Sequence, residues 1–170
     1  MNLTRLLRLG AVVAVVASLS GCAGGFSAAR GKTGGPITIE LAFEQNPTAR
    51  NPEQIAQLVE WMAPDLQRIL TRAGYNVIAQ PNANAFQPAP DHYLLFIHIV
   101  NYNAGSKAAR MLVGFGAGTL TLDTNNELYA GPGQLLMRSN GATGSSRDWN
   151  AAARRINEQV AREITVALNR

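Results

Sequence analysis

The sequence predicts an α+β fold in which two helices cover one face of a mixed β-sheet of about four or five strands. Two observations lead to this prediction. Short segments with apolar residues at every second position alternate with longer segments that repeat apolar residues at helical spacing. These segments follow one another in the order β-α-β-β-β-β-α. Because two helices can cover only one face of such a sheet, we expect a two-layer sandwich.

The first strand and the first helix have clear boundaries in the sequence. Residues 37–43 carry an apolar side chain at every odd position, which is typical of a half-buried strand. A helix is expected to begin at Pro52, with Asn51 as its N-cap, and to end at Gly74. Pro64 lies inside this helix and lacks the N–H of a helical hydrogen bond, so we expect a kink there.

Four further strands are predicted in the rest of the chain, at residues 75–80, 91–103, 119–124 and 127–139. The second of them is apolar on both faces, which favours a central place in the sheet. Residues 124–127 should form the turn between the last two strands, and Gly131-Pro132-Gly133 should bend or bulge the last one. A loop at residues 140–146 and a capping box at Ser145–Asp148 then lead into a final helix. The apolar face of that helix comprises Trp149, Ala153, Ile156, Val160, Ile164, Ala167 and Leu168.

The N-terminal residues have the pattern of an export signal. Arg5 and Arg8 precede an apolar run at residues 9–19, which has the length of a signal-peptide core and is too short to span a membrane. We expect residues 1–21 to be removed. Residues 22–35 would then form a glycine-rich tether behind Cys22, and residues 36–170 a single domain.

Leu19-Ser20-Gly21-Cys22 resembles the lipobox of bacterial lipoproteins. The resemblance implies diacylglycerol on the Cys22 sulfur, cleavage after Gly21 and acylation of the new amine, which together anchor a protein stably. It also implies the outer membrane as destination, because Ala23 and not aspartate follows the cysteine. The alternative is an ordinary secretory signal with a cysteine at this place by chance. Since the chain has one cysteine, an internal disulfide is excluded.

The charge of the chain argues against a nucleic-acid partner. The sequence has 15 basic and 11 acidic residues, and loss of Arg5 and Arg8 with the signal leaves 13 basic residues, a net charge of +2. Only Lys32 and Lys107 are lysines, and no basic run is present. Such a weak positive surplus is not typical of nucleic-acid-binding domains.

One glycine-rich stretch is a possible functional loop. Arg110 precedes Gly114, Phe115, Gly116 and Gly118. Glycine-rich loops can hold phosphate through backbone N–H groups, but a dinucleotide site needs a helix after the loop, and here a strand pattern follows. The stretch is therefore either a place where backbones pack closely or a site where Arg110 binds a carboxylate or phosphate.

The other polar residues favour no catalytic, metal or cofactor site. His92 and His98 share one strand face but stand roughly 20 Å apart, too far to bind one ion. No Gly-x-Ser-x-Gly sequence marks a nucleophilic serine. The carboxylate pairs Glu40/Glu44 and Glu60/Asp65 are interpreted as solvated surface. The final helix carries four arginines, Arg147, Arg154, Arg155 and Arg162. They are also interpreted as solvated surface, in preference to a site that contacts an anionic lipid or partner.

Residues 105–118 resemble the hallmark of a family of uncharacterised bacterial lipoproteins, a domain of unknown function. The hallmark is a strand, a short loop with a small residue and an arginine, and a Gly-Phe-Gly-x-Gly stretch; here these are Arg110 and Gly114 to Gly118. The resemblance covers most of residues 36–168. It implies a cell-envelope lipoprotein and supplies no substrate or catalytic residue.

Two functions are expected from these observations. The first is a non-enzymatic lipoprotein, anchored through Cys22, whose domain binds another envelope protein and lies in the periplasm. The alternative is a domain that binds a small ligand or glycan with Arg110 and the Gly114–Gly118 loop.

Overall fold

A computed structural model describes residues 28–32, 34–45, 52–80, 83–105, 119–131, 133–145 and 148–169. A five-stranded mixed sheet forms one layer, in the order β2-β1-β3-β4-β5. Its strands are β1 (Thr38–Gln45), β2 (Asn76–Ala79), β3 (His92–Asn103), β4 (Leu120–Tyr129) and β5 (Leu135–Ser145). β1 pairs in parallel with β2 and β3, whereas β4 pairs antiparallel with β3 and β5. The predicted element order and the central place of the apolar strand, β3, are confirmed.

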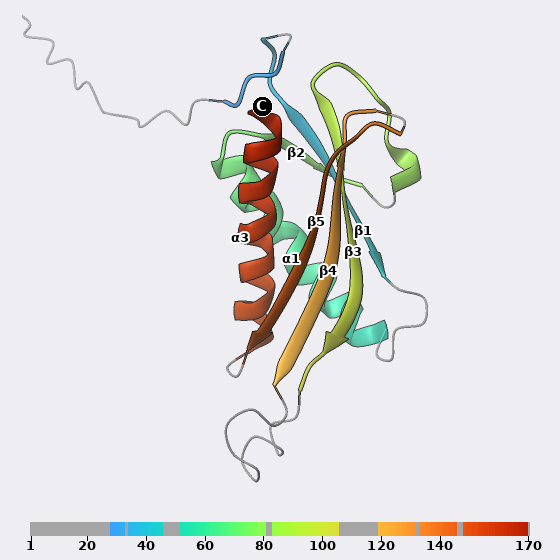
Figure 1. Ribbon diagram of the computed structural model, residues 1–170, viewed down its shortest axis with the longest axis vertical. Coiled ribbons are helices and arrows are strands. Elements are labelled where there is room, and N and C mark those ends of the chain that lie inside the picture. The colour runs from blue at the N-terminus through green and yellow to red at the C-terminus, as the bar shows by residue number, and fades with distance from the viewer. Residues whose placement is uncertain are drawn as a thin grey trace, which may run out of the picture.

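Two long helices form the second layer, α1 (Pro52–Arg72) and α3 (Trp149–Leu168), and a short 3₁₀ helix, η1 (Ala83–Ala85), lies before β3. Figure 1 shows α1 and α3 on the same face of the sheet, which confirms the predicted two-layer α+β sandwich. α1 continues through Pro64 as one helix. Its last residue is Arg72, and Gly74 follows as the predicted C′ glycine, with a φ of +95° that glycine adopts without strain.

The core lies between the helices and the sheet. Alternate residues of the three inner strands face the helices and are almost fully buried, because a strand directs every second side chain to one side. These residues are Ile39, Leu41, Leu95, Ile97, Ile99, Leu122 and Leu128. They pack against the apolar stripes of the helices, formed by Ile55, Leu58, Met62, Leu66, Leu70, Ile156, Val160 and Ile164.

The turn between the last two strands lies later than predicted. β4 runs without a break through residues 124–127, and the reversal occurs at residues 130–134, where the Ala130 N–H donates to the Gln134 carbonyl at 2.9 Å. Gly133 there has a φ of +74°, which favours glycine. Asn126 instead points into the domain, is fully buried, and donates to Ser139 at 3.4 Å. The pairing of long strands thus outweighs the local turn preference of two asparagines.

The start of the last helix also differs from the prediction. The predicted loop at residues 140–146 belongs largely to β5, which extends to Ser145 and pairs with the beginning of β4. The N-cap of α3 is Asp148, not Ser145. The Asp148 carboxylate accepts a hydrogen bond from the Ala151 N–H at 2.7 Å, and its φ of −145° is the extended conformation of a cap.

The described part of the predicted tether is held against the domain. The Ala29 N–H donates to the Gly74 carbonyl at 2.9 Å, and Arg30 forms an isolated bridge with Pro36. Between them, the Gly34 N–H donates to the Gly31 carbonyl at 2.9 Å. Ala28, the first described residue, therefore leaves the domain close to the end of α1.

Candidate binding groove between β5 and α3

Several residues singled out from the sequence lie outside the part of the chain that the structure describes. Cys22, Arg147 and the predicted loop residues Arg110, Gly114, Phe115, Gly116 and Gly118 lie outside the described residues. β3 ends before this loop and β4 begins after it, both at the end of the sheet opposite the start of β1 (Figure 1). The candidate site that the described residues form lies elsewhere, along β5.

β5 is an edge strand, because only β4 pairs with it in the described sheet. About half of the backbone N–H and C=O groups of an edge strand face away from the sheet and can pair with a further strand. β5 also exposes apolar side chains, with Leu135 and Leu136 each 39% exposed. An exposed edge with apolar residues is a typical place for another chain to add a strand.

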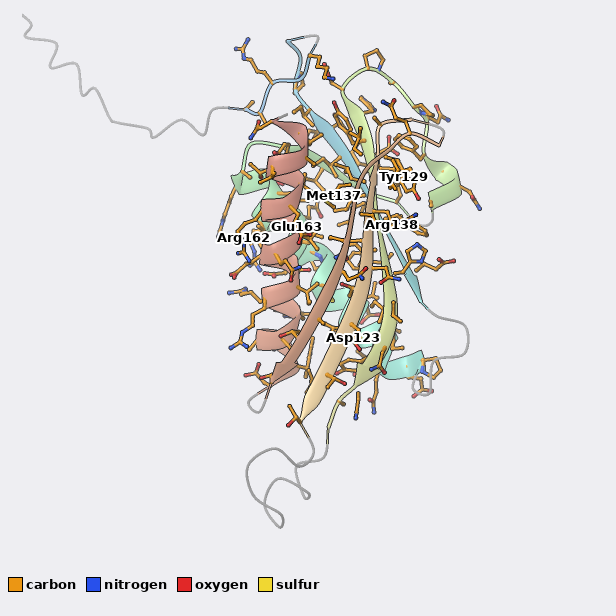
Figure 2. All side chains as sticks on the ribbon, in the orientation of Figure 1. Asp123, Tyr129, Met137, Arg138, Arg162 and Glu163 are labelled. Carbon is orange, nitrogen blue, oxygen red and sulfur yellow. The ribbon has the colours of Figure 1, made fainter. Side chains whose placement is uncertain are left out.

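A groove of about 480 Å³ runs between the first half of β5 and the last turns of α3. Figure 2 shows Met137 and Arg138 on β5, and Arg162 and Glu163 on α3 beside it. Val166 contributes an apolar wall and is 54% exposed. The full lining is Leu136, Met137, Arg138, Ser139, Arg162, Glu163, Val166 and Ala167.

The polar side of the groove is fixed by a chain of hydrogen bonds from the core. The buried Asn126 amide donates to the Ser139 hydroxyl, and that hydroxyl donates to the Glu163 carboxylate. Glu163 also accepts from the Gln159 amide at 2.9 Å. The Gln159 amide in turn lies 3.3 Å from the Asn140 carbonyl of β5. These bonds hold α3 at a set distance from β5 and satisfy the Glu163 charge inside the protein.

The two arginines of the groove differ in their partners. Arg138 is paired with Glu127 at 2.9 Å on the sheet face that carries no helix. The Tyr129 hydroxyl and Arg138 both donate to Glu127 and, against the effect of burial, hold the pKa of Glu127 below its ordinary value. Arg162 is exposed and has no ion pair among the described residues. Arg162 is therefore available to form an ion pair with a bound anionic group.

Gly141 sets the close approach of α3 to β5. A Cβ at this position would lie 2.6 Å from Thr124 Oγ1 and 2.8 Å from Ile156 Cδ1, both of which are buried. We expect Gly141→Ala to destabilise the protein by about 1–3 kcal/mol because the core there must shift. Gly144→Ala in the same strand is the control, since its Cβ would have ordinary contacts of 3.4 and 3.5 Å. Urea unfolding of both variants measures the difference, and equal stability would contradict this packing.

The two histidines lie on the helix-free face of the sheet and do not come together. His98 pairs with Glu44 at 2.7 Å and packs edge-on against Phe96, whereas His92 lies 3.6 Å from Glu40. Among the described residues, no three histidine, cysteine or acidic side chains are grouped so as to hold a metal ion.

Two carboxylates interpreted as solvated surface are in fact buried. Asp65 is 2% and Glu40 is 5% exposed. Asp65 accepts from Arg68, from Arg154 at 2.9 Å and from Asn157 at 3.1 Å, so that it joins α1 to α3. Arg154 therefore takes part in a helix contact, although it is exposed as predicted, like Arg155 and Arg162. The glutamate is bonded across the sheet, since Gln80 donates to Glu40 at 2.8 Å.

The groove was not predicted from the sequence. Leu135, Leu136 and Met137 are three consecutive apolar residues in a strand, and a strand with one solvated face should alternate. This departure was the available signal. It could not be used without the strand order, which makes β5 an edge.

Comparisons with known proteins place the domain in a family. The model of the family described as "Domain of unknown function (DUF4410)" matches residues 36–165. No curated protein matches the chain. The fold is similar to that of a single-substitution variant of the PelC dodecamer from Paraburkholderia phytofirmans, at 13% identity and a TM-score of 0.49, covering 85% of this chain and 93% of the other.

Two further solved structures are more distant in shape. A second PelC dodecamer from the same organism has 10% identity and a TM-score of 0.48, covering 78% and 87% of the two chains. A Helicobacter pylori protein described as a neuraminyllactose-binding hemagglutinin homolog has 12% identity and a TM-score of 0.33, covering 82% and 83%. Likeness at this level carries no functional assignment for the present chain.

Proposed function

The chain belongs to the DUF4410 family of domains of unknown function, and we propose that it is a lipid-anchored envelope lipoprotein whose domain binds another protein without catalysing a reaction. The observation that carries the binding role is the β5 edge with its adjoining groove. The anchor is supported by the sequence Leu19-Ser20-Gly21-Cys22.

The proposed anchor is the lipid on Cys22. In the part of the chain that the structure describes, no helix is long and apolar enough to cross a membrane. The short apolar run before Cys22 has the length of a removed signal. A lipid on Cys22, with the domain in the periplasm and Ala23 directing the protein to the outer membrane, accounts for these features.

The proposed occupant of the groove is an extended segment of another envelope protein. Such a segment can pair its backbone with β5, and every second side chain then points towards the groove. Leu136 and Val166 favour an apolar side chain there, and Arg162 favours a neighbouring acidic one because Glu163 is already bonded within the protein. The recognised chemistry is thus an extended segment with apolar and acidic residues.

A second copy of this chain fits the edge less well. Two β5 strands related by a two-fold axis would pair antiparallel. That pairing turns one copy upside down, so the two Ala28 residues would lie at opposite ends of the pair. Both copies could then not be held by short N-terminal tethers to one membrane surface.

A pair of valine variants tests this function. Val166→Asp places a charge in the groove, and Val100→Asp, the control, places one on β3 away from it. The two valines are similarly exposed, at 54% and 43% respectively. Proteins co-purified from crosslinked membranes would be compared with those of wild type and of an unrelated lipoprotein. We expect Val166→Asp to lose the wild-type partner by about tenfold, the effect of roughly 1.4 kcal/mol. Retention of the partner by Val166→Asp, or no partner above the unrelated lipoprotein, would refute the proposal.

A further inference from the structure

One end of the domain gathers the segments around Ala28, and we call it the tether end. It comprises residues 28–32, 34–38, 72–76, 88–92, 129–131 and 165–169. Hydrogen bonds join these segments: Ala29 N–H to the Gly74 carbonyl and Thr38 N–H to the Asp91 carbonyl, both at 2.9 Å, and the Tyr75 hydroxyl to Thr165 at 3.4 Å. Figure 1 shows this end at the top, with the C-terminal end of α3 beside it.

The exposed charges of the tether end are all positive in the described residues. Arg30, Lys32 and Arg72 are exposed. Asp91 is the one carboxylate among the residues of this end, and it is only 9% exposed. Its carboxylate accepts a hydrogen bond from the Lys32 backbone N–H at 2.8 Å. The surface of this end is therefore cationic although the whole mature chain is nearly neutral.

The local backbone keeps the Asp91 carboxylate covered while the neighbouring cations stay exposed. A Cβ on Gly31 would lie 2.0 Å from the carboxyl carbon of Asp91, so only glycine lets the turn approach this closely. The turn thereby covers Asp91, while Arg30 and Lys32 on either side of Gly31 remain exposed. Asp91 itself has a φ of +58°, a conformation that is uncommon outside glycine and asparagine or aspartate.

We propose that the tether end binds the anionic headgroups of the membrane in which the lipid of Cys22 is inserted. The inference rests on the proposed lipidation, since Cys22 precedes Ala28 by six residues and such a segment reaches at most about 22 Å. Within that reach, a cationic end is attracted to an anionic lipid surface. The domain then stands with Arg30, Lys32 and Arg72 towards the lipid. The β5 edge then faces sideways, and the end of β3 and the start of β4 lie at the far end (Figure 1).

Vesicle binding by the mature chain without its lipid tests this orientation separately from lipidation. The chain from residue 23 onward contains every described element. Sedimentation would compare vesicles of phosphatidylethanolamine and phosphatidylglycerol with vesicles of phosphatidylcholine. The test variant replaces Arg30, Lys32 and Arg72 with glutamine. The control variant removes the same number of exposed cations elsewhere, as Arg138→Gln, Arg155→Gln and Arg162→Gln. A third variant, Arg30→Lys with Arg72→Lys, keeps the charge.

Wild type is expected to bind the anionic vesicles and to lose that binding as salt rises. The tether-end variant, which loses three cations worth about 1 kcal/mol each, should bind about a hundredfold less, while the control and charge-keeping variants bind like wild type. An equal loss in the control variant would overturn the proposal, because net charge alone would then explain the binding. No preference of wild type for anionic vesicles would overturn it as well. Neither result bears on lipidation of Cys22, which is measured by labelling, or on the groove.

Discussion

Replacing Cys22 with serine is expected to abolish lipid labelling of the protein completely. The thiol of Cys22 is the nucleophile that would take up diacylglycerol, and the lipobox resemblance implies that cleavage after Gly21 follows only once the lipid is attached. Cys22→Ser should therefore incorporate no labelled palmitate and should keep residues 1–21. Metabolic labelling and the mass of the protein measure both effects.

The control for this prediction is Ser20→Ala, which keeps a small residue before the cysteine and should be labelled and cleaved like wild type. Cleavage of Cys22→Ser at the normal site would mean that an ordinary secretory signal is present. In that case the membrane anchor, but not the binding groove, would have to be abandoned.

Replacing Asp65 with alanine is expected to lower the free energy of unfolding by about 2–3 kcal/mol. Its carboxylate is buried between α1 and α3 and accepts hydrogen bonds from Arg68, Arg154 and Asn157. Removal leaves the buried Asn157 with the Met62 carbonyl as its remaining partner at 3.1 Å. The two arginines are about half exposed and can turn to water, which keeps the loss below that of a fully buried ion pair. Glu60→Ala, an exposed carboxylate of the same helix, should leave urea unfolding unchanged.

The pH dependence of the Asp65 effect has a definite direction. Burial alone would raise the pKa of Asp65, but the hydrogen bonds from Asn157, Arg68 and Arg154 and the charge of Arg154 outweigh it and lower the pKa from its ordinary value of 3.8. A lowered pKa means that the folded state prefers the ionised form. The contribution of Asp65 is therefore complete well above pH 3.8 and is lost as the pH falls through the lowered pKa. The stability difference between wild type and Asp65→Asn should narrow in acid, and a constant difference down to strongly acidic pH would contradict this assignment.

The sequence was sufficient for the fold class because its strongest signals are local. Apolar residues recur at the spacing that puts them on one side of a strand, as at Ile39 and Leu41, or of a helix, as around Leu58 and Val160. In the structure that side faces the core, and these residues are buried. The end of α1 just before Gly74 was predictable for the same reason, since a positive φ is a local requirement.

The features that the sequence did not reveal depend on distant residues. Asp65 is buried because Arg154 and Asn157, 89 and 92 positions later, surround it. Asn126 continues a strand because Ser139 of the neighbouring strand accepts its hydrogen bond. The candidate groove exists because β5 is last in the strand order, and strand order is set by the packing of the whole sheet. None of these contacts, nor the strand order, leaves a pattern in neighbouring residues of the sequence.

The central claim, that a partner segment lies along the β5 edge, is tested most directly by site-specific photocrosslinking in membranes. A photoreactive residue at Leu136 on β5 would be compared with one at Ile78 on β2, the opposite edge of the same sheet. The two side chains are 39% and 41% exposed, so access alone does not favour either position. We expect Leu136 to give a discrete crosslink to another envelope protein, at an extended segment with apolar and acidic residues, and Ile78 to give none. Crosslinking at Ile78 alone, or the same products from both positions, would contradict the claim.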